Sequence, residues 1–183
     1  MKVQSVNVGL PRLVEYRGEP IATGIYKDSV GDGRIAVNEF NLAGDAQADL
    51  RVHGGYSKAV YVYPSEHYEF WRGEFPEMDL PFGMFGENLT IEGLTEKDVN
   101  IGDKFRIGTA EFLVTEPRQP CFKLGIRFGR ADIIKRFAKS GRSGFYLAIE
   151  KTGELGAGDE IALLNREPNQ PSIFEVVRER FNL

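Results

Sequence analysis

Apolar residues occur along this chain in short runs that are rich in β-branched and aromatic side chains, with Gly, Asp and Asn between them. Such runs are typical of many short β-strands. Near the N-terminus the pattern predicts strands over 3–8 and 22–26, with a turn at 18–20 between them. We therefore expect mainly β structure from the first residues onward.

Turn residues followed by alternating apolar positions recur farther along the chain. After the turn at 31–33, Ile35 and Val37 alternate with polar or small residues, as in a half-buried strand. Gly-Asp pairs introduce similar runs at 101–107 and 157–164. The flanking residues differ, so these are not sequence repeats, and we interpret them as strand starts in a barrel-like sheet.

Three segments have helical spacing instead. One begins at Ser65, and a second, amphipathic helix is predicted over 131–141. In 171–183, Ser172 and Glu175 have the spacing of a capping box in front of an apolar helix face. The predicted fold is therefore mainly β with a few helices, the last of them short and C-terminal.

Length and composition limit the number of domains. With 183 residues and 42% apolar content, the chain can bury one well-formed core. The polar stretch NREPNQP, which contains two prolines, separates the last predicted helix from the strands. We therefore predict a β-barrel domain over 1–165, closed or partly closed, and a linker with a helical appendage over 166–183.

The net charge of −4 argues against a general nucleic-acid surface. Apolar runs such as AVYVY are far shorter than the roughly 20 residues of a membrane helix. The N-terminus, MKVQSVNVGL, has no signal-peptide architecture. We expect a complete cytoplasmic protein that binds neither nucleic acid nor membrane.

The only cysteine, Cys121, lies in the segment EPRQPCFKLGIRFG over 116–129. From 117 to 149 there are eight Lys or Arg and one acid, a local net charge of +7. Because the net charge of the whole chain is −4, the remaining residues carry a net charge of −11. Nearby cations favour the thiolate, which can act as nucleophile, redox centre or soft-metal ligand. A small buried hydrophobe is the alternative role for a lone cysteine. Two prolines, Pro117 and Pro120, predict a stiff, irregular loop here.

Basic side chains also gather around glycines before the strand AVYVY. Arg51, His53 and Lys58 surround a Gly-Gly pair, where backbone donors and cations can meet an anion together. A hairpin turn with solvated charges explains the same pattern. The segment lacks the Gly-Lys-Ser/Thr end of a P-loop.

Two further glycine-rich segments are FGMFGENLT, which contains Asn88, and SGRSGFY, which contains Arg142. The first is explained by close backbone packing, and the second serves equally as an anion contact or as a helix-to-strand turn. The other histidine, His67, lies in a predicted helix and is interpreted as a packing or surface residue. In combination, one thiol and several cationic glycine-rich loops favour capture of a flat, negatively charged ligand beside sulfur.

In their order along the chain, GDAQADLRVHGGYSKAVYVY, HYEFW, FGENLT, VNIGD, PRQPCFKL and GRSGFY resemble MOSC domains. This module is named after the C-terminal part of molybdenum cofactor sulfurases. The resemblance covers about residues 1–164 and is to the small bacterial single-domain members. It implies a barrel-like, predominantly β fold that binds the molybdenum cofactor, a molybdopterin, with a cysteine as a further metal ligand. It also implies reduction of N-hydroxylated compounds such as hydroxylaminopurines and amidoximes.

On this resemblance, Cys121 is the candidate metal ligand and catalytic sulfur, and His53 a candidate proton shuttle or phosphate contact. Electrons would come from a separate donor protein or a small reductant, because the chain has neither cluster-binding cysteines nor a flavin fingerprint. Homodimer formation is left open, since related reductases often continue into a longer helical extension. The candidate cofactor-binding residues are Arg51, Lys58, Asn88, Arg118, Lys123 and Arg142.

Two other functions remain open on the residues alone. The protein could carry sulfur or cofactor without turnover, with Cys121 as a persulfide or ligand. It could also be a cysteine hydrolase with His53 as the base.

Overall fold

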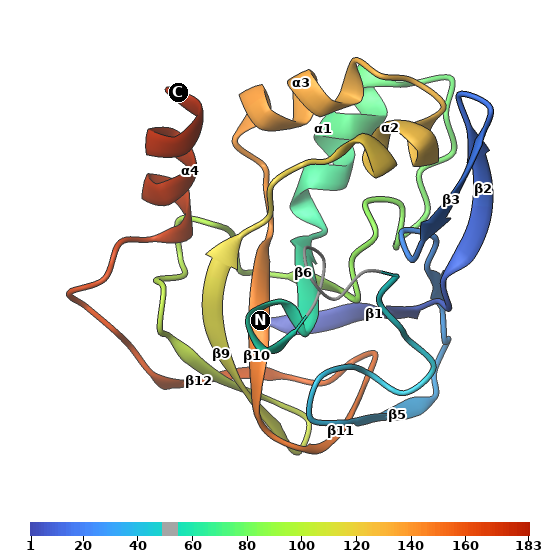
Figure 1. Ribbon diagram of the computed structural model, residues 1–183. Helices are drawn as coiled ribbons and strands as arrows, with labels where there is room; N and C mark the ends of the chain where they lie inside the picture. The colour runs from blue at the N-terminus through green and yellow to red at the C-terminus, as the bar shows by residue number, and fades with distance from the viewer. Residues whose placement is uncertain (49–54) are drawn as a thin grey trace.

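The computed structural model of the protein describes residues 1–48 and 55–183 (Figure 1). Most of its regular structure is β. The strands are β1 (Lys2–Val8), β2 (Arg12–Tyr16), β3 (Glu19–Thr23), β4 (Asp28–Ser29), β5 (Arg34–Val37), β6 (Val60–Pro64), β7 (Leu89–Glu92), β8 (Lys104–Ile107), β9 (Ala110–Pro117), β10 (Phe145–Lys151), β11 (Gly153–Gly156) and β12 (Ile161–Asn165). The helices are the 3-10 turn η1 (Tyr56–Lys58) and α1 (Glu66–Glu74), α2 (Phe122–Phe128), α3 (Ile133–Ser140) and α4 (Ile173–Phe181).

Eight strands form one mixed sheet in the order β12-β8-β9-β10-β6-β7-β1-β4. The β6–β7 pair is parallel and the others are antiparallel. The prediction of a mainly β fold is confirmed, but the prediction of a barrel is wrong because the sheet is open. Barrel closure needs a continuous ladder between the two edges. The edge strand β4 has two residues. In the described chain the start of β1 meets the start of β12 through an isolated bridge, Lys2 to Glu160, and three backbone hydrogen bonds between residues 1–3 and 158–161, which do not extend into a ladder.

Two small ribbons, β5 with β11 and β2 with β3, complete the β structure. The β2–β3 hairpin stands at one side of the molecule, beside α2 (Figure 1). Its turn is formed by Arg17 and Gly18 with φ of 55° and 82°, as a two-residue type I′ turn requires. The sequence pattern placed the second strand at 22–26, whereas β3 ends at Thr23 and β2 was missed. Arg-Gly is not the Asn-Gly or Asp-Gly pair that signals such a hairpin, and the register depends on that turn.

The interior consists of two apolar clusters. The larger one is mostly aliphatic and lies along the main sheet, with Val6, Val62 and Phe112 among its members. The second is aromatic, and it lies where α1, α2 and α3 gather at one end of the molecule (Figure 1). Within it, Trp71 stacks on Phe137 with centroids 6.0 Å apart. This aromatic cluster supports the segment that carries Cys121.

Three predicted helices are confirmed as α1, α3 and α4. The capping box of α4 is present: the Ser172 hydroxyl accepts from the Glu175 N–H, and the Glu175 carboxylate accepts from the Ser172 N–H. Two of its residues, Ile173 and Val177, are buried in the aliphatic cluster. The division at 165 and 166 stays a prediction. No helix in residues 1–48 and 55–183 is long and apolar enough to cross a membrane.

Candidate functional site

The segment of the only cysteine differs from its predicted form. Instead of an irregular loop over 116–129, β9 continues to Pro117 and α2 begins at Phe122, with Cys121 as its N-cap residue. The prolines sit at a strand end and before a helix, where a missing N–H does not interrupt a ladder. The helix forms because Leu124 and Phe128, four positions apart, bury one face in the aromatic cluster. Only residues 118–121 lie outside both elements.

A cleft opens where this segment meets β6 and the loops that follow β3. Its empty space, counted together with the solvent at its mouth, is about 590 Å³. Its lining comes from parts of the chain that are far apart in sequence: Thr23, Gly24, Ile25, Lys27, Asp45, Ala46, Gln47, Ala48, Lys58, Tyr61, Gly86, Asn88, Arg118, Cys121, Lys123 and Tyr146.

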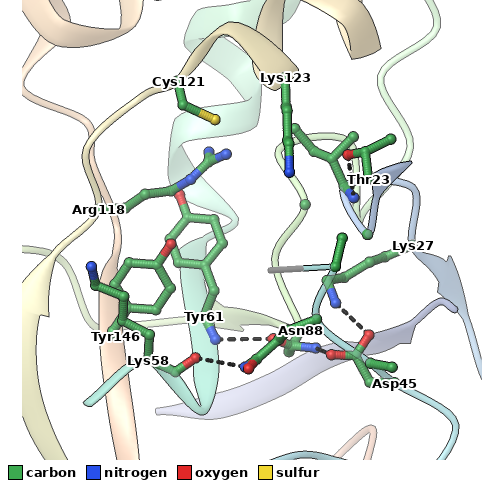
Figure 2. A pocket seen from close by; sticks show the side chains of 16 residues that line it. Thr23, Lys27, Asp45, Lys58, Tyr61, Asn88, Arg118, Cys121, Lys123 and Tyr146 are labelled. Carbon is green, nitrogen blue, oxygen red and sulfur yellow. Dashed lines mark hydrogen bonds and ion pairs between the residues drawn. The ribbon is translucent and has the colours of Figure 1, made fainter. Parts of the chain in front are cut away.

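The thiol of Cys121 lies at one end of this cleft. The residue is half-buried. Figure 2 shows its sulfur pointing into the same space as the Arg118 guanidinium and the Lys123 ammonium group. A soft sulfur atom is therefore presented to the cleft between two cations.

Arg118 is only 6% exposed. Its guanidinium lies over the rings of Tyr61 and Phe137, 4.8 Å and 5.6 Å from their centroids. Among residues 1–48 and 55–183, its buried Nη1 atom has no hydrogen-bond partner. A buried, unpaired guanidinium donor is costly. An anionic ligand in the cleft would remove that cost.

Two tyrosines line the wall next to Arg118, and their ring centroids are 5.2 Å apart. Burial is the main reason that the pKa of Tyr61 lies well above its usual value, and it also raises the pKa of Tyr146. Both hydroxyls therefore stay protonated at neutral pH. The Tyr61 hydroxyl donates to the Ser143 carbonyl at 2.8 Å, which holds the ring in place.

The base of the cleft is a buried polar network (Figure 2). Lys27 Nζ pairs with Asp45 Oδ1, which also accepts from the Gly9 N–H at 3.0 Å. Asp45 Oδ2 accepts from Asn88 Nδ2 at 2.9 Å, and Asn88 Oδ1 accepts from the Tyr61 N–H at 3.0 Å. Burial lowers the pKa of Lys27, although Asp45 acts in the opposite direction. The network connects four separate segments, those of Gly9, Lys27, Asp45 and Asn88, to β6.

The glycine-rich segment FGENLT supports this base. Glu87 is fully buried and accepts hydrogen bonds from the Gly83 N–H at 2.7 Å, the Phe85 N–H at 3.1 Å and the hydroxyls of Thr90 and Tyr68. Gly86 has φ of 79°, and a Cβ there would come within 2.9 Å of Ile25 Cγ1. The segment therefore serves close packing, as the simpler interpretation proposed, and in doing so it positions Asn88.

The structure brings together most of the predicted site residues. Cys121, Arg118, Lys123, Lys58 and Asn88 all line the cleft. Arg51 and His53 lie outside the described residues, so their predicted roles remain predictions.

Arg142 is not among the lining residues. Its guanidinium stacks 3.8 Å from the Phe70 ring centroid and donates to the Ser140 carbonyl. His67 lies on α1 and pairs with Glu96 at 2.8 Å. Its side chain is largely buried, in line with its predicted packing role.

The sequence pattern missed Lys27, Asp45, Tyr61 and Tyr146. The two tyrosines lie in predicted strands, and the sequence does not reveal which face of the sheet a cleft will occupy. Lys27 and Asp45 form a buried ion pair between two loops. The residues next to them in the sequence do not indicate that these two side chains meet. Among the lining residues there are four cations and one carboxylate. The cleft is therefore suited to a polyanion with a flat apolar part, held beside sulfur.

The fold and the site together are a mixed β-sheet with a cysteine at a cationic cleft. The MOSC domain model matches residues 49–162, and the chain belongs to the MOSC domain family. It is 45% identical to the Bacillus subtilis protein YflK over 90% of this chain and 73% of that one. It is 39% identical, over 88% of its length, to a Gibberella moniliformis protein named "Reductase", of which it spans 29%. The crystal structure of YiiM from Geobacillus stearothermophilus superposes with a TM-score of 0.80 at 32% identity, over 98% of this chain and 83% of that one.

Proposed function

We propose that the protein is a molybdenum-cofactor-dependent reductase of N-hydroxylated compounds, with Cys121 as a sulfur ligand of the metal. The observation that carries the proposal is the buried, unpaired Nη1 of Arg118 beside the Cys121 sulfur in one cleft. Family membership and the reductase name of the Gibberella relative support it.

The residues fit the molybdenum cofactor chemically. A thiolate is the soft ligand that such a metal prefers, and Cys121 can supply it. Arg118 and Lys123 would neutralise the phosphate of the pterin, whereas Lys27 and Lys58 already face Asp45 and Glu116. The wall formed by Tyr61 and Tyr146 offers apolar ring surface to the flat pterin.

Reduction of an N-hydroxyl group breaks the N–O bond. It consumes two electrons and two protons, and it yields the amine and water. When bound, the cofactor would supply two-electron oxygen-transfer chemistry, and we propose a separate protein as the electron donor. The protein's own residues bind and orient: Arg118 holds the anion, the tyrosine wall limits water, and the Lys27–Asp45–Asn88 network keeps the base of the cleft rigid.

The test is molybdenum and pterin content of protein produced in a host that makes the cofactor. We expect about one molybdenum per wild-type chain and its loss in Cys121→Ser, because the substitution removes the soft ligand. Arg118→Gln should lower the content at least tenfold, since a charge-assisted hydrogen bond contributes about 1.5–3 kcal/mol.

Arg142→Gln is the matched control, because Arg142 also stacks on an aromatic ring but lies outside the cleft lining. It should keep the wild-type molybdenum content. Wild-type protein without molybdenum would overturn the proposal. Protein that holds cofactor but turns over no N-hydroxylated substrate with any donor would instead favour the carrier function.

A further inference from the structure

The C-terminal helix α4 contacts the segment that carries the site from outside the cleft. Residues 118–121 lie between β9 and α2 and include both Arg118 and Cys121. The helix packs on β9, and Figure 1 shows it beside the end of that strand, where the chain turns toward α2. It lies outside residues 49–162, which the MOSC domain model matches. Family membership therefore assigns no role to this contact.

The contact is made by two side chains, Gln119 and Arg180. Gln119 is exposed, and it lies against the guanidinium of Arg180 on the last turn of α4. With its amide oxygen facing the helix, Gln119 accepts from Arg180 Nη1 at 2.8 Å and from Nε at 3.2 Å. The other amide orientation would place N–H groups against a guanidinium that only donates, so the oxygen faces α4. Two donors on one oxygen restrict where Gln119 can lie.

The helical turn that carries Arg180 is itself well fixed. Val177 is buried in the aliphatic cluster, and Phe181 packs against that cluster. The helix ends at Asn182, which has φ of 52° and donates its N–H to the Arg178 carbonyl. Arg180 therefore extends from a helix end that is held by both packing and capping.

The segment beside it has few other ties. Within the described part of the chain, the backbone of 118–120 makes no hydrogen bond to another backbone group. Pro120 biases Gln119 to an extended conformation, in which neighbouring side chains point to opposite sides. Accordingly, Arg118 is buried while Gln119 is exposed. A hold on Gln119 from outside therefore limits how far the Arg118 guanidinium can move from Cys121, with which it interacts electrostatically.

We propose that Arg180 is a positioning residue for the site: by holding Gln119, it keeps the Arg118 guanidinium beside the Cys121 sulfur. Arg180 is not among the residues that line the cleft, so it acts through the segment and not on a ligand. The inference goes beyond the proposed function, because cation and sulfur are arranged in this way before any ligand binds.

The experiment is alkylation of the only cysteine in the 183-residue chain, produced in a host that lacks the cofactor. Iodoacetate is anionic and iodoacetamide is neutral. The ratio of their rates therefore reports the positive charge near the sulfur, whereas the thiolate fraction cancels. Relative to the same ratio for the neutral thiol 2-mercaptoethanol, we expect an enhancement of about fivefold in the wild type, as one charge pair about 4 Å apart in water implies.

Arg180→Ala should lower this enhancement about twofold, because loss of one hydrogen bond shifts a conformational equilibrium about two- to tenfold. Arg180→Lys, which keeps a donor, should retain most of it. Gln119→Ala should have the same effect as Arg180→Ala. The double variant should show no further loss, because both substitutions remove the same contact.

Arg178→Ala is the matched control. Arg178 is exposed on the same helix and carries the same charge, but its guanidinium donates to the Leu183 carbonyl and lies over the Phe174 ring. It should keep the wild-type enhancement. No enhancement in the wild type, no change in Arg180→Ala, an equal loss in Arg178→Ala, or additive losses in the double variant would overturn the proposal. Because no cofactor is present, the result is independent of whether the protein binds molybdenum.

Discussion

Arg118 and Arg142 show how the surroundings of a residue determine what its side chain can do. Both guanidiniums lie against aromatic rings. Arg142 also donates to the carbonyl of Ser140, two residues away, whereas Arg118 keeps a buried donor without a partner in the cleft. A side chain whose hydrogen bonds are local has little left for a ligand. Unsatisfied donors in a cleft therefore identify binding residues better than charge alone.

Glu87 provides a prediction at the residue scale. Burial is the largest effect on its carboxyl and raises its pKa above the usual value, although four donors partly oppose the shift. At a pH between the unfolded-state pKa and the raised folded-state pKa, the carboxyl group is more protonated in the folded protein than in the unfolded chain. Its contribution to the free energy of unfolding should therefore fall as pH rises from about 4.5 through the raised pKa.

The measurement is urea unfolding of wild-type protein and Glu87→Gln between pH 4.5 and 8. The stability difference, wild type minus variant, should decrease with rising pH and then level off. Lys151→Gln, on an exposed ion pair with Glu111, is the control and should show no such trend. A difference that grows with pH would contradict the assigned direction of the shift.

At the scale of the elements, the helices begin in different ways. The N-cap of α4 is Ser172, which completes a capping box, whereas Ser65 at the start of α1 makes no side-chain cap hydrogen bond. The N-cap of α2 is Cys121, also without a side-chain cap bond. The N-cap position of α2, where Ser, Thr, Asp or Asn is preferred, is therefore occupied by the cysteine of the cleft.

The two N-cap serines give a matched prediction. Ser172→Ala should lower the free energy of unfolding by about 1 kcal/mol, because the Glu175 N–H loses its acceptor. Ser65→Ala should change it by no more than a few tenths of a kcal/mol. Urea unfolding of both variants measures the difference. Equal losses would show that the capping hydrogen bond of α4 does not contribute to stability.

At the scale of the whole molecule, α4 belongs to the main core. Its residues Ile173 and Val177 are fully buried in the aliphatic cluster, and the helix packs on β9. The β9 strand also leads into the segment that carries Arg118 and Cys121. The C-terminal helix therefore supports the strand from which the site is built.

Val177 and Val176 test whether α4 is an appendage or part of the fold. Val177→Ala should lower the free energy of global unfolding by about 1.5–3 kcal/mol, the contribution of a fully buried valine. Val176→Ala, at a half-buried position on the same helix, should cost less than about 1 kcal/mol, with the same change in helix propensity. Two equal values, or a separate unfolding step for α4 by circular dichroism, would favour the division at residue 165.

Local patterns were sufficient for much of this protein. Alternation and turn residues predicted β1, β5, β8 and β12, and helical spacing with a capping box predicted α1, α3 and α4. These features depend on residues that are close in sequence. The lone cysteine among cations was likewise visible without coordinates, and so was the resemblance to the MOSC family.

Only the tertiary structure decided which of the candidate residues meet. Sheet closure depends on whether the edge strands pair over long distances, and in the described part of the chain β12 and β4 do not pair. The hairpin β2–β3 was lost because Arg-Gly is a weak turn signal, and α2 because two prolines masked a short buried helix face. The Lys27–Asp45 pair, the exclusion of Arg142 and the buried donor of Arg118 all follow from packing between distant segments. Such packing depends on the whole fold, because burial is a property of neighbours in space rather than of neighbours in the chain.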